Sequence, residues 1–247
     1  MDARLILAAL FFLSTAHAFE HAPWDAQLKK NVVLLDGGKA SQLRYAGVDR
    51  KALQTYLDQL SAVKEKEFAS WPREEQMAFL INAYNAFTVE KILIRYPDIG
   101  SIWDFGKIFG NPFKDEFFTL LGRKMSLDAI EHGLLRKNYR EPRVHYALNC
   151  ASVGCPMLRE EAYVAARLKR QLEEQAVRFL SDRSRNRYRD GRLEMSKIFD
   201  WFKEDFEPRQ AYFARYASRL GYPGGEVPLS FLDYDWSLND FRSSSRR

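Results

Sequence analysis

The sequence predicts an α+β fold, a helix-rich single domain with a small antiparallel sheet. Most of the chain has helical apolar spacing, whereas the predicted strands form short pairs around tight turns and do not alternate regularly with helices. Hydrophobic residues make up 46% of the chain, which suffices for one large core. No repeat and no Pro/Gly-rich linker divides the chain, so we expect one domain over residues 19–240.

Residues 1–18 have the features of a cleavable signal peptide. A polar start carries Arg4, an apolar run follows from Leu5 to Leu13, and Ala16-His17-Ala18 offers small residues at a cleavage site. The run is shorter than the ~20 residues of a membrane-spanning helix, and no second run of that kind is evident. We therefore expect cleavage after Ala18 and a periplasmic or secreted mature protein with no integral membrane span.

The net charge of +5 comes from basic residues scattered among nearly as many acidic ones. This distribution does not predict a nucleic-acid-binding face, and export also argues against such a partner. The two densest basic stretches, 183–192 and 242–247, are typical of a solvated loop and of a disordered basic tail, which we place at residues 241–247. The expected partner is a small-molecule or peptide substrate of unknown identity in the cell envelope.

Three hairpins are predicted, each from β-prone residues on both sides of a turn. The turns are Asp36-Gly37-Gly38, Gly122-Arg123 and Asp190-Gly191. A further short strand is predicted from Val144 to Leu148, before a turn rich in small residues.

The helices follow from apolar spacing and from capping and stop signals. Asp49 is a predicted N-cap of an amphipathic helix. A more apolar helix is predicted from Arg73 to Tyr96, where Pro97 ends it, and we expect it to be the central buried helix. The remaining predicted helices are Leu127–Asn138, Glu160–Ser181 and two aromatic-rich helices within residues 199–220.

The stretch from Val144 to Pro156 contains His145 and both cysteines of the chain, Cys150 and Cys155. Backbone N–H groups or an imidazole could lower the pKa of the Cys150 thiol and make it a nucleophile. The alternative is a Cys150–Cys155 disulfide, because an even number of cysteines is expected to pair in an oxidising compartment. No metal site is predicted, since the spacing is unusual for zinc and a fourth ligand is missing.

A second group of candidates lies on the predicted helix from Leu127 to Asn138. Glu131 and His132 lie beside its apolar face. His132 is a candidate general base, and Glu131 a candidate partner that would stabilise the imidazolium. The alternative is a half-exposed histidine, with Glu131 and Arg136 in structural ion pairs.

Two amides, Asn82 and Asn85, interrupt the apolar helix and share one of its faces. Buried amides need hydrogen-bond partners, so we expect them to clamp a neighbouring loop. Asn85 has the alternative role of orienting a catalytic histidine, as the Asn does in Cys-His-Asn hydrolases. Asn82, Tyr84 and Asn149 are candidate binding residues.

These stretches, in this order, resemble the family called domain of unknown function 547. The resemblance implies that family members have a cysteine at the position of Cys150 and histidines at the positions of His132 and His145. It also implies that some relatives replace Cys155. It does not imply an established activity. Some eukaryotic relatives carry a coiled coil, for which this chain has no heptads. The resemblance covers about residues 67–239 and rests on Asn82–Ala86, Leu127–His132, Leu135-Arg136 and His145–Cys150, with similar later blocks at Ser196–Phe202, Asp205-Phe206 and Leu232–Asn239.

The leading functional hypothesis is a cysteine-dependent hydrolase or acyltransferase that acts on amide or thioester bonds without a cofactor. The expected mechanism and fold type are those of papain or transglutaminase. Cys150 would attack the acyl group and His132 would accept the thiol proton. Glu131, Asn85 and Asn149 are candidate orienting or oxyanion groups.

His132 is preferred over His145 as the base. Five residues of straight strand would place His145 ~16 Å from Cys150. Two alternatives to the enzyme remain. One is a non-enzymatic envelope binding or structural protein with a Cys150–Cys155 disulfide, and the other is a thiol redox protein.

Overall fold

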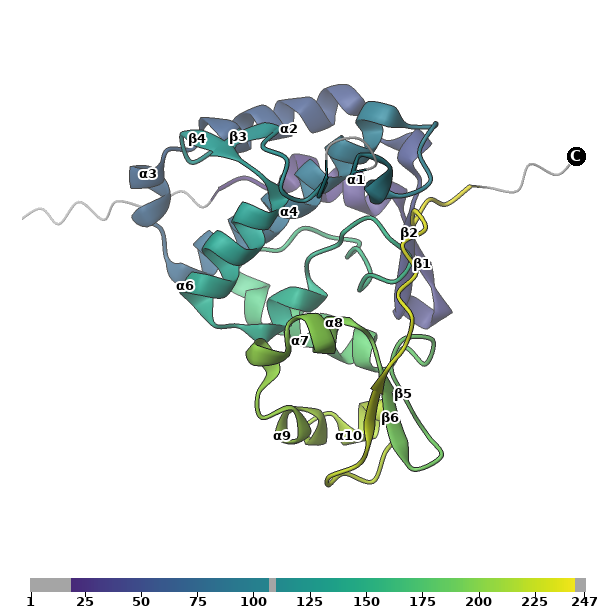
Figure 1. Ribbon diagram of the computed structural model, residues 1–247. Helices are drawn as coiled ribbons and strands as arrows, with labels where there is room; N and C mark the ends of the chain where they lie inside the picture. The colour runs from purple at the N-terminus through teal and green to yellow at the C-terminus, as the bar shows by residue number, and fades with distance from the viewer. Residues whose placement is uncertain (1–18, 107–109, 243–247) are drawn as a thin grey trace, which may run out of the picture.

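The computed structural model describes residues 19–106 and 110–242, shown in Figure 1. The predicted signal peptide at 1–18 and residues 243–247 of the predicted tail lie outside the described residues. The chain is a helix-rich α+β fold, as predicted. Its first half consists of α1 (Ala22–Asn31), β1 (Val32–Leu35), β2 (Ala40–Leu43), α2 (Arg50–Ala62), α3 (Glu65–Ala69) and α4 (Arg73–Arg95), with short 3-10 helices at Asp36–Gly38, Tyr45–Gly47 and Ile102–Asp104.

Helix α4 is the centre of the larger core. It ends at Arg95, as the following Pro97 predicts, and most of its side chains are buried. Helix α2 packs against it and α1 packs against α2, and the side chain of Asp49 caps α2 by accepting a hydrogen bond from the Ala52 amide at 3.0 Å. Within the described residues, α4 alone is long and apolar enough to cross a bilayer, and 89% of its apolar window is buried inside the protein.

The three predicted hairpins are confirmed, although the second turns at Leu121-Gly122 and not at Gly122-Arg123, and they form separate small sheets. Strands β1 and β2 pair with each other alone, as do β3 (Phe118–Leu120) and β4 (Arg123–Met125). The third hairpin, β5 (Arg187–Arg189) and β6 (Arg192–Met195), gains β7 (Leu229–Phe231), which pairs in parallel with β6. Sequence analysis missed β7 because a parallel strand arrives by a long crossover and has no turn signal beside it.

The segment before the cysteines has a different secondary structure from the predicted one. The strand predicted from Val144 to Leu148 is wrong: Pro142–Tyr146 is a 3-10 helix. Pro142 is well placed at its start, and the Glu141 carboxylate accepts a hydrogen bond from the Arg143 amide at 3.1 Å, which caps the helix. The local cap thus outweighs the β-propensity of the apolar run.

Two predicted helices differ from the observed ones. The helix predicted from Glu160 begins only at Leu168, because side-chain amides of Asn82 and Gln171 bind the extended backbone at Tyr163 and Val164. The predicted helix Leu127–Asn138 is mainly a π-helix. The elements are the π-helix Ala129–Arg136, α6 (Lys137–Tyr139), the 3-10 helix Ala165–Arg167, α7 (Leu168–Leu180), α8 (Ile198–Trp201), the 3-10 helix Lys203–Phe206, α9 (Arg209–Ala214) and α10 (Ala217–Leu220).

A smaller core lies under α7 to α10 and β5 to β7, in the lower part of Figure 1. From there the C-terminal segment runs back to the larger core. Leu238 pairs with Ser152, and the Leu43 amide donates to Asn239 O at 2.9 Å. The Phe241 amide donates to Leu43 O at 3.0 Å and Arg242 binds the Asp240 carboxylate at 2.8 Å, so the contacts extend two residues into the segment that we assigned to the tail.

Candidate functional site

A cavity of about 410 Å³ lies where α4, the π-helix, the cysteine loop and the C-terminal segment meet. Its lining includes Cys150, Cys155, Glu131, His132 and His145, so the structure brings these predicted site residues to one place. Aromatic rings form much of the remaining wall: Tyr84, Trp103, Phe113, Trp201, Phe202, Tyr234 and Trp236.

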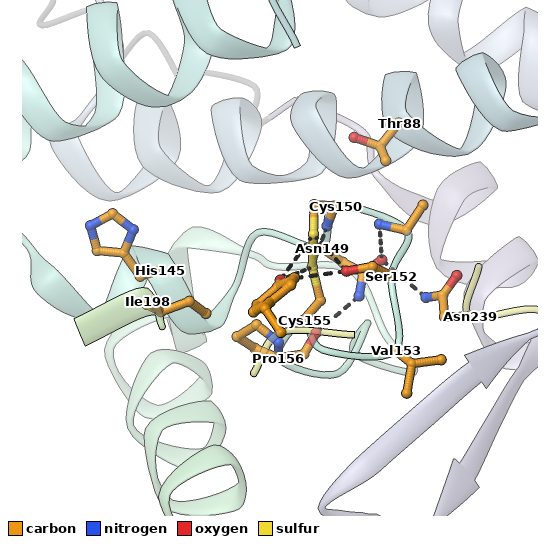
Figure 2. Close-up of a disulfide and its surroundings, with 12 residues drawn as sticks. Thr88, His145, Asn149, Cys150, Ser152, Val153, Cys155, Pro156, Ile198 and Asn239 are labelled. Atoms are coloured by element: carbon orange, nitrogen blue, oxygen red, sulfur yellow. Dashed lines mark hydrogen bonds between the residues drawn. A yellow bond between two sulfur atoms is a disulfide. The ribbon is translucent and has the colours of Figure 1, made fainter. Parts of the chain in front are cut away.

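The two cysteines are bonded to each other, with their Sγ atoms 2.11 Å apart (Figure 2). Cys155 is only 3% exposed, whereas Cys150 is half-buried. The Cys155 sulfur accepts a hydrogen bond from the Cys150 backbone amide at 2.9 Å and one from the Tyr234 hydroxyl at 3.2 Å. The Cys150 sulfur lies 3.2 Å from the same Tyr234 hydroxyl and 3.1 Å from Ser152 Oγ.

Asn149 organises the turn that the disulfide closes. Its Nδ2 donates to Pro156 O at 2.9 Å, and its Oδ1 accepts from the Ala151 amide at 3.0 Å. The Asn239 side chain, from the C-terminal segment, donates to the same Oδ1 at 3.2 Å. Ala151 itself has a left-handed φ of 62°, which is rare for a residue with a Cβ. Asn149 therefore shapes the loop from within and does not line the cavity.

Each of the two asparagines of α4 binds the backbone of a neighbouring segment through two hydrogen bonds, an arrangement that we call a clamp. Asn85 donates to Ala147 O at 2.9 Å and accepts from the Asn149 amide at 2.9 Å. Asn82 donates to Tyr163 O at 2.8 Å and accepts from the Tyr163 amide at 3.0 Å. Both amides thus bind backbone of neighbouring segments, and neither contacts a histidine through these bonds.

His145 lies between two carboxylates. Its Nε2 is 2.7 Å from Asp205 Oδ2 and its Nδ1 is 3.6 Å from Glu131 Oε1, while the side chain is 1% exposed. Burial lowers the pKa of His145, but the hydrogen bonds to Asp205 and Glu131 outweigh burial and raise that pKa above its ordinary value. Burial raises the pKa of Asp205, but the hydrogen bonds from His145 and Arg136 have the larger effect and lower that pKa below its ordinary value.

His132 belongs to a neighbouring chain of charged groups on the π-helix. Its Nδ1 lies 2.6 Å from an Arg136 nitrogen and its Nε2 lies 3.6 Å from Asp128 Oδ1. Arg136 in turn binds Asp205 with two nitrogens, at 2.5 and 3.1 Å. Asp205 is therefore the common partner of Arg136 and His145.

Neither histidine is hydrogen-bonded to Cys150 within the part of the chain that the structure describes. Each ring nitrogen of His132 and His145 already faces another charged group. Figure 2 draws His145 to one side of the disulfide, with no bond between them. His132 was preferred over His145 because a straight strand would have placed His145 far from Cys150. Residues 142–146 are helical, so that reason no longer holds.

The aromatic wall is a connected cluster around Trp236. Its ring centre lies 4.6 Å from that of Tyr234, 5.4 Å from that of Trp103 and 5.8 Å from that of Trp201. Faces of such rings attract organic cations. Two carboxylates, Asp128 and Glu131, line the same cavity.

The sequence assigned no role to Asp205 or Tyr234 in the site, and it indicated Arg136 only as a member of a structural ion pair. Asp205 and Tyr234 lie in the later blocks of the resemblance. Their place in those blocks was the one sequence feature that could have indicated a role in the site. Residues 19–106 and 110–242 contain no cluster of three or more His, Cys, Asp or Glu side chains that could hold a metal ion.

Comparison with known proteins gives one match. The family described as "Protein of unknown function, DUF547" matches residues 68–180, which include α4, the π-helix and the disulfide loop. No curated protein and no solved structure matches the chain. Asp205, Trp201, Tyr234 and Trp236 complete the site from beyond the matched range. Because the match spans the asparagine clamps, both histidines and both cysteines, residues 68–180 form a domain of the DUF547 family of proteins of unknown function.

Proposed function

We propose that the chain is an exported thiol–disulfide exchange protein, in which a small thiol enters the cavity and reacts with the Cys150–Cys155 bond. One observation carries the proposal. The disulfide forms part of the cavity wall, and the Cys155 sulfur already accepts hydrogen bonds from the Cys150 amide and the Tyr234 hydroxyl. These donors would stabilise the negative charge that develops on a departing sulfur.

The two sulfurs have different roles in the proposed reaction. An incoming thiolate attacks the more exposed Cys150 sulfur, the bond between the cysteines breaks, and Cys155 leaves as a thiolate. Burial raises the pKa of Tyr234, so its hydroxyl keeps its proton near pH 7 and donates to that thiolate. A second thiol then attacks the mixed disulfide. The balance is two small thiols oxidised to their disulfide and one protein disulfide reduced to two thiols.

The lining supports a preference for thiols with a positive charge. Asp128 and Glu131 are both acidic, and the raised pKa of His145 favours an imidazolium that offsets part of their negative charge. The rings of Trp201, Tyr234 and Trp236 add faces that attract an ammonium group. An oxidising location, periplasmic or secreted, would supply the disulfide form and is part of the proposal.

The hydrolase or acyltransferase hypothesis stays a prediction from the sequence. It needs a histidine nitrogen that can accept the Cys150 proton. The described hydrogen bonds give that step less support than they give thiol exchange, because both imidazoles already have charged partners. A papain-like or transglutaminase-like fold also stays a prediction, since no solved structure matches.

The first experiment compares three thiols of similar size: cysteamine, 2-mercaptoethanol and 3-mercaptopropionate. Reduction of the protein disulfide is followed by alkylation and intact mass, and each rate is divided by the thiolate fraction of the reagent. We expect cysteamine to react fastest and 3-mercaptopropionate slowest. Equal normalised rates would remove the proposed charge preference. No reduction by any of them without denaturant would make the disulfide a structural staple and favour the binding-protein alternative.

Matched cysteine variants test the roles of the two sulfurs. Cys155→Ala should form a mixed disulfide readily with cystamine, the disulfide of cysteamine, whereas Cys150→Ala should react slowly because Cys155 is buried. Tyr234→Phe should slow reduction by about ten-fold, since it removes a hydrogen bond to the departing thiolate. Tyr188→Phe, outside the cavity, is the control. Equal reactivity of both cysteine variants would contradict the assignment of Cys150 as the attacked sulfur.

A further inference from the structure

The backbone nitrogen of Phe19 lies 2.7 Å from Oε1 of Glu75. Phe19 is the residue that follows the predicted cleavage site, and Glu75 is a carboxylate in the first turn of α4 that is only 6% exposed. Fifty-six positions separate the two residues in the chain. The start of the described chain is thus held against the central helix by a buried acid.

Within the described residues, Glu75 takes part in no ion pair, and the Phe19 nitrogen is its one hydrogen-bond donor. A buried carboxylate that meets only a neutral amide is costly, although the amino end of α4 offsets part of that cost. A positive charge at the position of the Phe19 nitrogen would compensate the carboxylate directly. Cleavage after Ala18 would create such a charge, because it converts that amide nitrogen into an α-ammonium group.

Two titratable side chains whose rings contact Phe19, His21 and Tyr56, carry no charge near pH 7. His21 Nδ1 lies 2.7 Å from the Tyr56 hydroxyl. Burial lowers the pKa of His21 to about 4 and raises the pKa of Tyr56 well above its ordinary value. Both side chains are therefore neutral, and neither supplies a positive charge to Glu75.

The Phe19 side chain fixes the position of its nitrogen. Its ring centre lies 5.0 Å from that of Phe79, 5.0 Å from that of His21, 6.1 Å from that of Trp71 and 6.2 Å from that of Tyr56. Such a ring cluster holds residue 19 in place without further chain before it.

We infer that Glu75 is the receptor for the mature N-terminus: hydrolysis of the Ala18–Phe19 bond releases an α-ammonium that forms a buried ion pair with this carboxylate. Removal of the leader then completes the folded structure in addition to releasing the protein. The inference is independent of the chemistry at the disulfide. It places the cleavage site at the Ala18–Phe19 bond and makes Glu75 the partner of the new N-terminus.

The test compares two chains, one that starts at Phe19 after removal of an N-terminal fusion and one that starts at His17. Only the first has an ammonium group at the Phe19 nitrogen. We expect its thermal midpoint to be higher by about 5 °C or more. Glu75→Gln should abolish the difference, whereas Glu74→Gln, which changes the neighbouring acid that pairs with Lys169, should leave it intact.

A second measurement needs no variant of Glu75. The α-amino group of the chain that starts at Phe19 should react with an amine-specific acylating reagent at least about ten times more slowly than that of the chain that starts at His17, because the ion pair protects it and raises its pKa. The exported protein should have the mass of a chain that begins at Phe19. Equal midpoints and equal labelling rates, or a different mature start, would overturn the inference.

Discussion

His145 Nε2 lies 2.7 Å from Asp205 Oδ2, although sixty positions separate the two residues in the chain. The bond joins the 3-10 helix before the disulfide loop to the segment after α8. Arg136 binds the same carboxylate from the π-helix. One acid thus connects three elements around the cavity, and its partners make the stability of the protein depend on pH.

We predict that the contribution of His145 to stability decreases as pH rises. The folded-state pKa is above the unfolded value of ~6.5, so the stabilisation is complete below that pH and is lost as pH rises through the folded-state pKa. The difference in urea midpoint between wild type and His145→Gln should therefore shrink from pH 6 to pH 9. His21→Gln should show the opposite trend, since the pKa of His21 is lowered to about 4 and its neutral form is the stable one. A constant difference for His145→Gln would contradict this prediction.

The asparagine clamps offer a matched pair of variants. Asn85→Ala and Asn82→Ala each remove two buried hydrogen bonds, so each should lower the free energy of unfolding by about 2–4 kcal/mol. Only Asn85 binds the backbone that leads into Cys150. We therefore expect Asn85→Ala alone to change the rate of reduction of the disulfide, as measured by alkylation and mass. If both variants change that rate equally, the clamp at Asn85 has no specific role in the site.

Gly154 is predicted to tolerate no side chain. A Cβ there would lie 3.0 Å from the backbone N and O of Asp235 and 3.0 Å from the Tyr234 ring. Gly154→Ala should therefore cost about 1–3 kcal/mol and displace Tyr234 from the sulfurs. Gly133→Ala, where a Cβ would meet nothing within 4 Å, is the control and should be neutral or stabilising by up to ~1 kcal/mol. Urea unfolding and tyrosine fluorescence measure both effects, and a neutral Gly154→Ala would show that the loop can move away.

The disulfide should contribute to stability as well as to reactivity. It links residues five positions apart, and the chain-entropy estimate for so short a loop is about 2 kcal/mol. We expect the double variant Cys150→Ala/Cys155→Ala to remain folded and to lose about that amount in urea unfolding. Reduced wild type is the control and should unfold at a similar urea concentration. A loss much larger than this would indicate that the loop collapses without the bond and would favour a purely structural role.

Local signals in the sequence determined the hairpins around residues 36–38, 122 and 190–191, the cap at Asp49 and the apolar helix that ends before Pro97. These features depend on neighbours in the chain, so short-range physics suffices to predict them. The same holds for the clamp role of Asn82 and Asn85, because a buried amide must find hydrogen-bond partners wherever the helix places it. The sequence also indicated the family and the grouping of His132, His145 and Cys150.

Only the tertiary structure decided which charges meet and what surrounds the sulfurs. Asp205 reaches His145 and Arg136, and Tyr234 reaches Cys155, through contacts between segments sixty or more positions apart. Such contacts depend on how the C-terminal segment crosses from the smaller core to the larger one, and no local pattern encodes that path. The strand predicted at Val144–Leu148 failed for a local reason, since a cap from Glu141 overrode the apolar pattern. Propensity determined the local elements, whereas long-range packing and hydrogen bonding determined the site.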